Sequence, residues 1–337
     1  MPHIIPVSEA DCQVKSWKIL LKEAVCEPQQ LLTKLNLTTA QLNYKVDYNN
    51  PFATRVPQPF IDKMQPGDPE DPLLRQVLAQ TAENERVKNY SEDPLGETTN
   101  DSAGLLHKYH ARVLLILASA CAVNCRYCFR RHFPYQDKLA SGKQLESAIN
   151  YITQHTDISE VILSGGDPLI VSDCQLVELI RSIEKIPHVR RLRIHTRLPV
   201  VLPQRLTPEL LSSLQKSRLH CSIVLHINHP NEIDPVLQQY LAPFCASEVT
   251  LLNQSVLLRE VNDCLDTLVA LSEKLFAAGI LPYYLHQLDR VHGSAHFEVS
   301  DKLAIALVTQ MRNRLPGYLV PRLSREETGA AAKQVIA

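Results

Sequence analysis

Short apolar runs alternate with amphipathic stretches of helical length from about residue 112 to residue 314. Each apolar run has the length of a buried strand, and the runs lie at 112–119, 160–164, 191–196, 221–226, 249–253 and 280–286. Apolar positions at helical spacing follow them over 143–155, 173–184, 208–217, 234–241, 263–278 and 301–314. Strands that alternate with helices predict a parallel sheet with right-handed crossovers.

Six strand–helix units predict an α/β fold, an open and partial (β/α)6 version of the eight-unit barrel. In such folds the chemistry collects on the loops that follow the carboxyl ends of the strands. Prolines interrupt the polar segment before the barrel, so we expect only short helices there, over 14–25, 29–34, 38–45 and 72–80. The expected regions are an N-terminal, mostly helical region (1–105), a barrel (106–315) and a C-terminal tail (316–337).

The overall composition is that of an ordinary globular protein. The 337 residues are 45% hydrophobic and 21% charged, with a formal net charge of −1. This near-neutral balance lacks the excess of positive charge by which proteins typically bind nucleic acid. The longest apolar run, over 113–123, is interrupted by Ser119 and is too short to span a membrane. The first residues lack the basic and apolar segments of a signal peptide. We therefore expect a cytoplasmic protein that binds neither nucleic acid nor membrane.

Three cysteines lie within eight residues, directly after the first expected strand: Cys121, Cys125 and Cys128. Thiolates at this spacing suit zinc or an iron–sulfur cluster held by a loop. A structural zinc site would need a fourth ligand, which His132 could supply, although the chain has no second Cys-x-x-Cys pair. On a four-iron cluster, three thiolates would leave one iron open to a small molecule.

Polar clusters also follow other strands. Gly165, Gly166 and Asp167 follow the second strand, where paired glycines allow a sharp turn close to a ligand, or simply a turn. His226 ends the fourth strand and Gln254 follows in the fifth. All these positions fall on the rim that carries the cysteines.

Several charged residues have two interpretations from the sequence alone. Arg130, which precedes Arg131, could bind a carboxylate through two parallel hydrogen bonds or lie solvated on the surface. Asp289 follows the sixth strand and could bind an ammonium group or start a loop. Lys333, close to the end of the chain, has the position of a solvated tail lysine.

The cysteine spacing, Tyr127 before the third cysteine and the glycine turn together resemble the radical S-adenosylmethionine (SAM) superfamily. Over about 105–333 the chain also resembles the lysine 2,3-aminomutases. The resemblance is carried by blocks at 112–114, 125–131, 164–168, 196–205, 226–232, 253–259, 261–263 and 282–284. These blocks in this order are highly specific.

The resemblance implies three cofactors. A [4Fe–4S] cluster would be bound by Cys121, Cys125 and Cys128, SAM would bind to its open iron, and pyridoxal 5′-phosphate (PLP) would be the second organic cofactor. Lys333 would hold PLP through its amine and would therefore not be a solvated tail lysine. Arg112 would bind the phosphate.

The same resemblance implies the remaining site residues. Arg130 would bind the carboxylate of L-lysine and Asp289 its side-chain ammonium, together with Glu326, which stands where the family has an aspartate. The SAM contacts would be Gly165, Gly166, Asp167, His226 and Gln254.

The implied activity is that of an isomerase that moves the 2-amino group of L-lysine to C3. The chain lacks the C-terminal extension of the clostridial enzymes and resembles short bacterial members that supply (R)-β-lysine for attachment to translation elongation factor P (EF-P). The implied partners are L-lysine, an electron donor such as flavodoxin or ferredoxin, and functionally the EF-P lysylation ligase. The alternatives are an aminomutase for another amino acid, such as glutamate, and a cysteine–zinc binding module.

Overall fold

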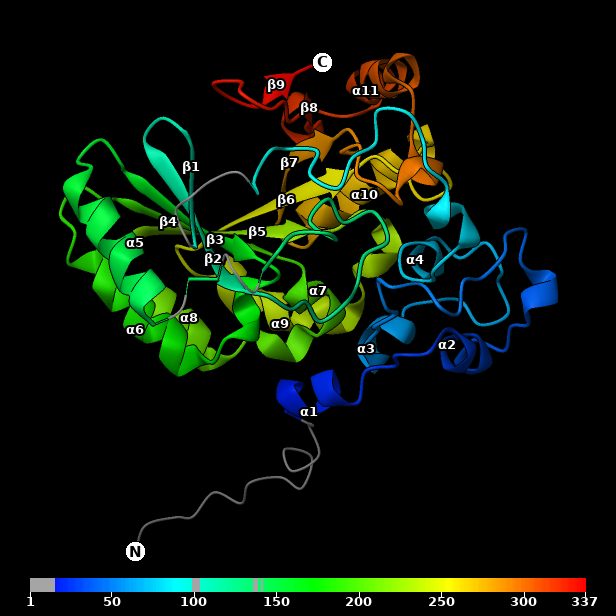
Figure 1. Ribbon diagram of the computed structural model, residues 1–337, viewed down its shortest axis with the longest axis horizontal. Helices are drawn as coiled ribbons and strands as arrows, with labels where there is room; N and C mark the ends of the chain where they lie inside the picture. The colour runs from blue at the N-terminus through cyan, green and yellow to red at the C-terminus, as the bar shows by residue number, and fades with distance from the viewer. Residues whose placement is uncertain (1–15, 99–103, 136–138, 141) are drawn as a thin grey trace, which may run out of the picture.

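A single sheet of nine strands organises the computed structural model, which describes residues 16–98, 104–135, 139–140 and 142–337. The strands follow one another in chain order across the sheet (Figure 1). Neighbours from β2 to β8 run parallel, whereas β1 and β9 pair antiparallel at the two edges. The strands are β1 (Leu105–Tyr109), β2 (Arg112–Ala118), β3 (Glu160–Gly165), β4 (Arg191–Thr196), β5 (His220–His226), β6 (Thr250–Val256), β7 (Leu281–His286), β8 (Arg322–Arg325) and β9 (Gln334–Val335).

Helices connect the successive parallel strands and lie outside the sheet (Figure 1). The helices of this part are α5 (Lys143–Gln154), α6 (Asp173–Glu184), α7 (Leu198–Val201), α8 (Pro208–Gln215), α9 (Pro235–Cys245), α10 (Leu265–Ala277) and α11 (Asp301–Arg314). Several begin where the sequence provides a cap: the Ser172 side chain accepts from the Gln175 amide at α6, and Asp234 accepts from Leu237 at α9. The expected α/β fold, a partial barrel of six strand–helix units formed by β2 to β7, is confirmed.

Three strands have no counterpart in the sequence prediction. β1, β8 and β9 were missed because each is short, and β8 begins and ends with arginine, so none shows the alternation of a buried strand. Their pairing depends on the edges that the central strands offer. The consequence is largest at the C-terminus, where β8 extends the sheet beside β7 and β9 pairs with β8. The tail expected over 316–337 is therefore attached to the sheet.

The N-terminal region consists of short helices and turns: α1 (Trp17–Lys22), α2 (Pro28–Lys34), α3 (Gln58–Ile61) and α4 (Pro72–Arg75). The helices expected at 38–45 and 72–80 are shorter in the structure, a 3₁₀ turn at Thr39–Gln41 and α4, and the expected residues 14–15 lie outside the described part. Buried side chains such as Leu31, Phe60 and Leu74 belong to the same hydrophobic core as the barrel. The region thus shares the core of the barrel.

Strand register places the loops that carry polar residues at one end of the sheet. Leu163 of β3 aligns with Ile194 of β4, and His226 of β5 aligns with Gln254 of β6. The carboxyl ends of the parallel strands therefore form a common rim. Within the described residues, no helix combines the length and the apolar character that a membrane crossing requires.

Candidate active site

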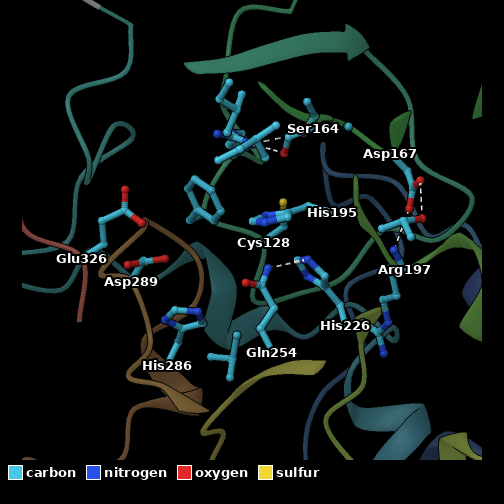
Figure 2. Close-up of a pocket in the computed structure, with 18 of the residues that line it drawn as sticks. Cys128, Ser164, Asp167, His195, Arg197, His226, Gln254, His286, Asp289 and Glu326 are labelled. Carbon is cyan, nitrogen blue, oxygen red and sulfur yellow. Dashed lines mark hydrogen bonds between the residues drawn. The ribbon is translucent and has the colours of Figure 1, made fainter. Parts of the chain in front are cut away.

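The rim encloses a cavity of about 300 Å³. Figure 2 shows Asp289 and Glu326 together at one end of it, Asp167 and Arg197 at the other, and Cys128 between them. Every site residue expected from the sequence lines this cavity: Cys121, Cys125, Cys128, Arg112, Arg130, Gly165, Gly166, Asp167, His226, Gln254, Asp289, Glu326 and Lys333. Residues more than 200 positions apart in the chain thus meet in one space.

The cysteine loop follows β2 and is held from the N-terminal region. Between the half-buried Cys125 and Cys128, the Arg126 side chain is fully buried and forms a two-point ion pair with Glu83. Arg131 donates to the same carboxylate at 2.7 Å. Because a buried carboxylate anchors both arginines, the segment between them has a fixed path. The cysteines are therefore presented to the cavity by a rigid loop.

Burial makes ionisation of the thiols costly unless positive charge is nearby. It raises the pKa of Cys121, and it raises the pKa of Cys128 to about 11. Cys125 has a direct partner, since Nη1 of Arg197 lies 2.8 Å from its Sγ. A buried guanidinium beside the loop suits a cluster that carries thiolate charge.

The cysteines are not arranged around a single ion. In the described part of the chain, no three His, Cys, Asp or Glu side chains could together hold one metal ion. His132, the fourth ligand of the zinc alternative, stacks on the ring of His292 with centroids 5.8 Å apart and contacts the His292 carbonyl oxygen. A four-iron cluster offers a separate iron to each thiolate, so it does not require the sulfurs to converge on one point.

The glycine turn after β3 packs against the backbone of the cysteine loop. A Cβ at Gly165 would lie 2.8 Å from the carbonyl oxygen of Ala118, and one at Gly166 would lie 2.4 Å from that of Ala120. Asp167 accepts four hydrogen bonds, from the amides of 169, 197 and 198 and from the Thr196 hydroxyl. These residues therefore shape the wall of the cavity through the backbone around them.

His226 and Gln254 are neighbours across β5 and β6, and their side chains form a hydrogen bond (Figure 2). Burial lowers the pKa of His226 to about 3, with the charges of Arg197, Lys333 and Arg130 acting in the same direction. The imidazole is neutral at physiological pH and can donate or accept a hydrogen bond in the cavity.

Lys333 enters the cavity from the segment between β8 and β9. Its Nζ lies 3.3 Å from Nε2 of His286, 3.7 Å from Oε2 of Glu326 and 5.2 Å from the centre of the Tyr284 ring. Burial lowers the pKa of Lys333, opposed by the charges of Glu326 and Asp289. The pairing of β8 with β7 thus converts a tail lysine into a partly buried amine.

Two arginines lie near this amine. Arg112 stacks on the Tyr109 ring at 4.8 Å, and the charges of Arg193 and Arg112 both act to lower the pKa of Lys333. Nε of Arg193 is buried and has no partner among the described residues. An amine with an aromatic ring and two guanidinium groups around it fits a phosphorylated aldehyde.

Two carboxyl groups stand beside Lys333. Burial, together with the charge of Glu326, raises the pKa of Asp289 to about 7. The Asp289 carboxylate accepts no hydrogen bond from the residues that the structure describes, whereas Glu326 pairs with Lys108 at 3.4 Å. Two acids at one end of a buried space suit a ligand with an ammonium group.

Comparison with known proteins identifies the family. The model of the radical SAM superfamily matches residues 115–249. The L-lysine 2,3-aminomutase of Haemophilus influenzae is 47% identical over 99% of this chain and 99% of its own length, and that of Escherichia coli is 46% identical over 99% and 97%. The enzyme of the same name from Clostridium subterminale is 34% identical over 97% of this chain and 78% of its own. The chain belongs to the L-lysine 2,3-aminomutase family.

Membership of this radical SAM family implies a [4Fe–4S] cluster and SAM. The cavity of this aminomutase-family chain fits them, since its three thiols lie beside a buried guanidinium and a neutral histidine. Family membership also sets aside the cysteine–zinc module as an explanation of the cysteines.

Other residues of this aminomutase-family cavity were missed in the sequence. His195 is the last residue but one of β4 and His286 ends β7, so the rule that selected His226 would have found both. Arg197 follows β4 directly and could have been found in the same way. Glu97 and Lys108 had no signal, because they come from the N-terminal region and the edge strand β1.

Proposed function

We propose that this protein is an L-lysine 2,3-aminomutase that moves the 2-amino group of L-lysine to C3, with PLP as a cofactor beside the cluster and SAM. The aminomutase activity is supported by identity along the full length of relatives that carry this name. The observation that carries the finer assignment is the presence of Lys333, Asp289 and Glu326 in the cavity that also contains the three cysteines.

The cysteine side of the cavity is assigned to the cluster and SAM. Cys121, Cys125 and Cys128 hold the cluster, while His226 and Gln254 contact SAM. When bound, the cluster and SAM would supply the radical for the reaction, and PLP would supply an aldehyde that holds the substrate amino group. Gly165, Gly166 and Asp167 contribute by fixing the loop backbone against which SAM lies.

The opposite side is assigned to PLP. Lys333 binds its aldehyde through the amine, whose pKa is lowered by burial. Arg112, joined by Arg193, binds the phosphate, and the Tyr284 ring lies beside the amine. His286 is neutral because burial depresses its pKa, so its Nε2 can exchange a hydrogen bond with Nζ of Lys333.

The substrate is assigned to the charged groups between these two sides. Arg130 binds the carboxylate of L-lysine, and Asp289 with Glu326 binds the side-chain ammonium. A glutamate substrate would direct its second carboxylate at these two acids, which disfavours the glutamate alternative. The Glu326 side chain is one methylene longer than the aspartate of the resembled family, which would shift the position of the bound substrate.

Three further assignments rest on the resemblance alone: (R)-β-lysine as the product, a flavodoxin or ferredoxin as electron donor, and the use of the product for EF-P modification. The division into an N-terminal region (1–105), a barrel (106–315) and a tail (316–337) stays a proposal that rests on the residue pattern along the chain.

Borohydride reduction of the PLP-loaded protein, followed by peptide mass spectrometry, tests the PLP assignment. We expect a phosphopyridoxyl adduct at Lys333 and its loss in Lys333→Arg. Lys108 is a matched control, because it is a second lysine in the same cavity. Lys108→Arg should leave the adduct at Lys333 unchanged. An adduct at Lys108, or no adduct at all, would refute the assignment.

A further inference from the structure

Five charged side chains of alternating sign form a continuous series across the cavity. Nε of Arg130 lies 2.7 Å from Glu97, and Nζ of Lys108 lies 3.0 Å from Glu97 on its other side. The same Lys108 ammonium is 3.4 Å from Glu326, which is 3.7 Å from Lys333. The series begins and ends at groups with an assigned role, but Glu97 and Lys108 in its middle have none.

Glu97 binds the edge of the Arg130 guanidinium, formed by Nε and Nη2, that can give a carboxylate two parallel hydrogen bonds. Its two carboxylate oxygens accept from Nε at 2.7 Å and from Nη2 at 3.1 Å. Nη1 donates to the Ser164 hydroxyl at 3.1 Å and to the Gly165 carbonyl oxygen at 3.4 Å. A guanidinium has five N–H groups, so one remains free. A substrate carboxylate therefore cannot bind this edge through two parallel hydrogen bonds while Glu97 holds it.

Lys108 has the corresponding position at the other end. Its ammonium lies against Glu326, as the side-chain ammonium of lysine would. The Glu97 side chain is 5% exposed and that of Lys108 24% exposed, so both charges lie inside the cavity, where water screens them weakly. There they compete with the charged ends of a ligand for Arg130 and Glu326.

We propose that the Glu97–Lys108 ion pair occupies the places of the two charged ends of the substrate and is displaced by it, which makes both residues determinants of specificity. The proposal rests on the proposed function, because that function assigns Arg130 to the carboxylate and Glu326 to the ammonium. Glu97 competes for Arg130 and Lys108 competes for Glu326, so each charged end of the substrate displaces one of them.

Displacement of the pair selects ligands by charge at both ends. A ligand with a carboxylate and a distant ammonium replaces both contacts, so Arg130 and Glu326 stay paired. A ligand with only one of these groups displaces only one member of the pair and gains only one contact, so it binds more weakly. Specificity then comes from filling both places at once.

Equilibrium dissociation constants of three ligands test the proposal. The protein is the anaerobic holoenzyme without a reductant, so that no turnover occurs. The ligands are L-lysine, L-norleucine, which lacks the side-chain ammonium, and L-lysinamide, which lacks the carboxylate. The variants are Glu97→Gln and Lys108→Met. Glu327→Gln is the matched control, since Glu327 is exposed and adjacent to Glu326 in the chain.

The two variants should respond to different ends of the ligand. Glu97→Gln should tighten L-lysine and L-norleucine by about tenfold and leave L-lysinamide unchanged. Lys108→Met should tighten L-lysine and L-lysinamide by a similar factor and leave L-norleucine unchanged. Glu327→Gln should change none of the three.

Weaker L-lysine binding in either variant would overturn the proposal, because the residue would then support Arg130 or Glu326 instead of competing for it. An equal change for all three ligands would overturn it as well. The proposed function is judged separately from the wild-type protein: if this binds the three ligands equally, the assignments of Arg130 and of the two acids fail, whatever the variants do.

Discussion

At the scale of single residues, the cavity shows how burial prepares ionisable groups for a charged substrate. Asp289 has no hydrogen-bond donor among the described residues, and burial together with Glu326 holds its pKa at about 7. Below this pH the carboxyl group is mostly neutral and cannot balance the positive charge of an ammonium group. Above it the carboxylate is charged and needs a cation. The substrate ammonium supplies that cation.

Lysine affinity should therefore rise as the pH increases from about 6 to about 8, by up to roughly tenfold per pH unit below the pKa. The measurement is the dissociation constant of L-lysine in the wild type and in Asp289→Asn, where this dependence should disappear. L-norleucine should show no such rise in the wild type. A pH profile that is the same in Asp289→Asn would contradict the role of Asp289.

The raised pKa of Asp289 affects folding stability in the opposite direction: as the pH rises, this contribution to stability falls. The folded protein retains a proton on Asp289 that the unfolded chain releases above its ordinary value of 3.8. The Asp289 contribution to stability is therefore lost as the pH rises through about 7.

At the scale of elements, the cysteine loop depends on a contact with the N-terminal region. Glu83 lies in the 3₁₀ turn Thr81–Asn84, is fully buried, and pairs with Arg126 and Arg131 on either side of Cys128. The described residues of the loop between β2 and α5 form no helix or strand. Its path is therefore determined by a carboxylate about 40 residues earlier in the chain.

Glu83→Gln should destabilise the protein by about 3–5 kcal/mol, because it leaves two buried guanidinium groups without their counter-charge. Iron bound after anaerobic reconstitution should fall as well, since the cysteines lose their fixed positions. Denaturant unfolding and iron analysis measure the two effects. Glu85→Gln, an exposed neighbour, is the control. Full iron content with unchanged stability would show that the loop is held by other contacts.

At the scale of the whole molecule, the N-terminal region and the barrel form one structural unit. One core cluster contains buried apolar residues of both parts, from Trp17 to Ile280. Lys63, whose side chain is 1% exposed, connects the two parts: it donates to the Val200 and Glu232 carbonyl oxygens and pairs with Asp234 at 3.2 Å. Separate unfolding of either part would expose this shared core.

We therefore expect a single cooperative unfolding transition. The only tryptophan, Trp17, is buried in the N-terminal region, so its fluorescence reports on that region, while far-ultraviolet circular dichroism reports mainly on the barrel. The two signals should change at the same denaturant concentration, and in Lys63→Met both should shift together to a lower one. Transitions that separate in the wild type would show that the two parts are independent domains.

Much of this structure is encoded locally. The six strands and most of the barrel helices were predictable because burial on a sheet or on a helix face imposes a period within each segment, as at 173–184 and 191–196. The cysteines, His226 and Gln254 could be placed on the rim because parallel strands end on the same side. The role of Lys333 had no such signal and came only from resemblance.

The sequence by itself determined the order of strands, the rim and the three thiols, because these follow from local periodicity and spacing. Only the tertiary structure decided that β8 pairs with β7 and brings Lys333 beside both His286 and Glu326. It also decided that Glu97 and Lys108 lie between Arg130 and Glu326. Such contacts join segments far apart in the chain, and they depend on how the curved sheet brings its edges together, which no local pattern records.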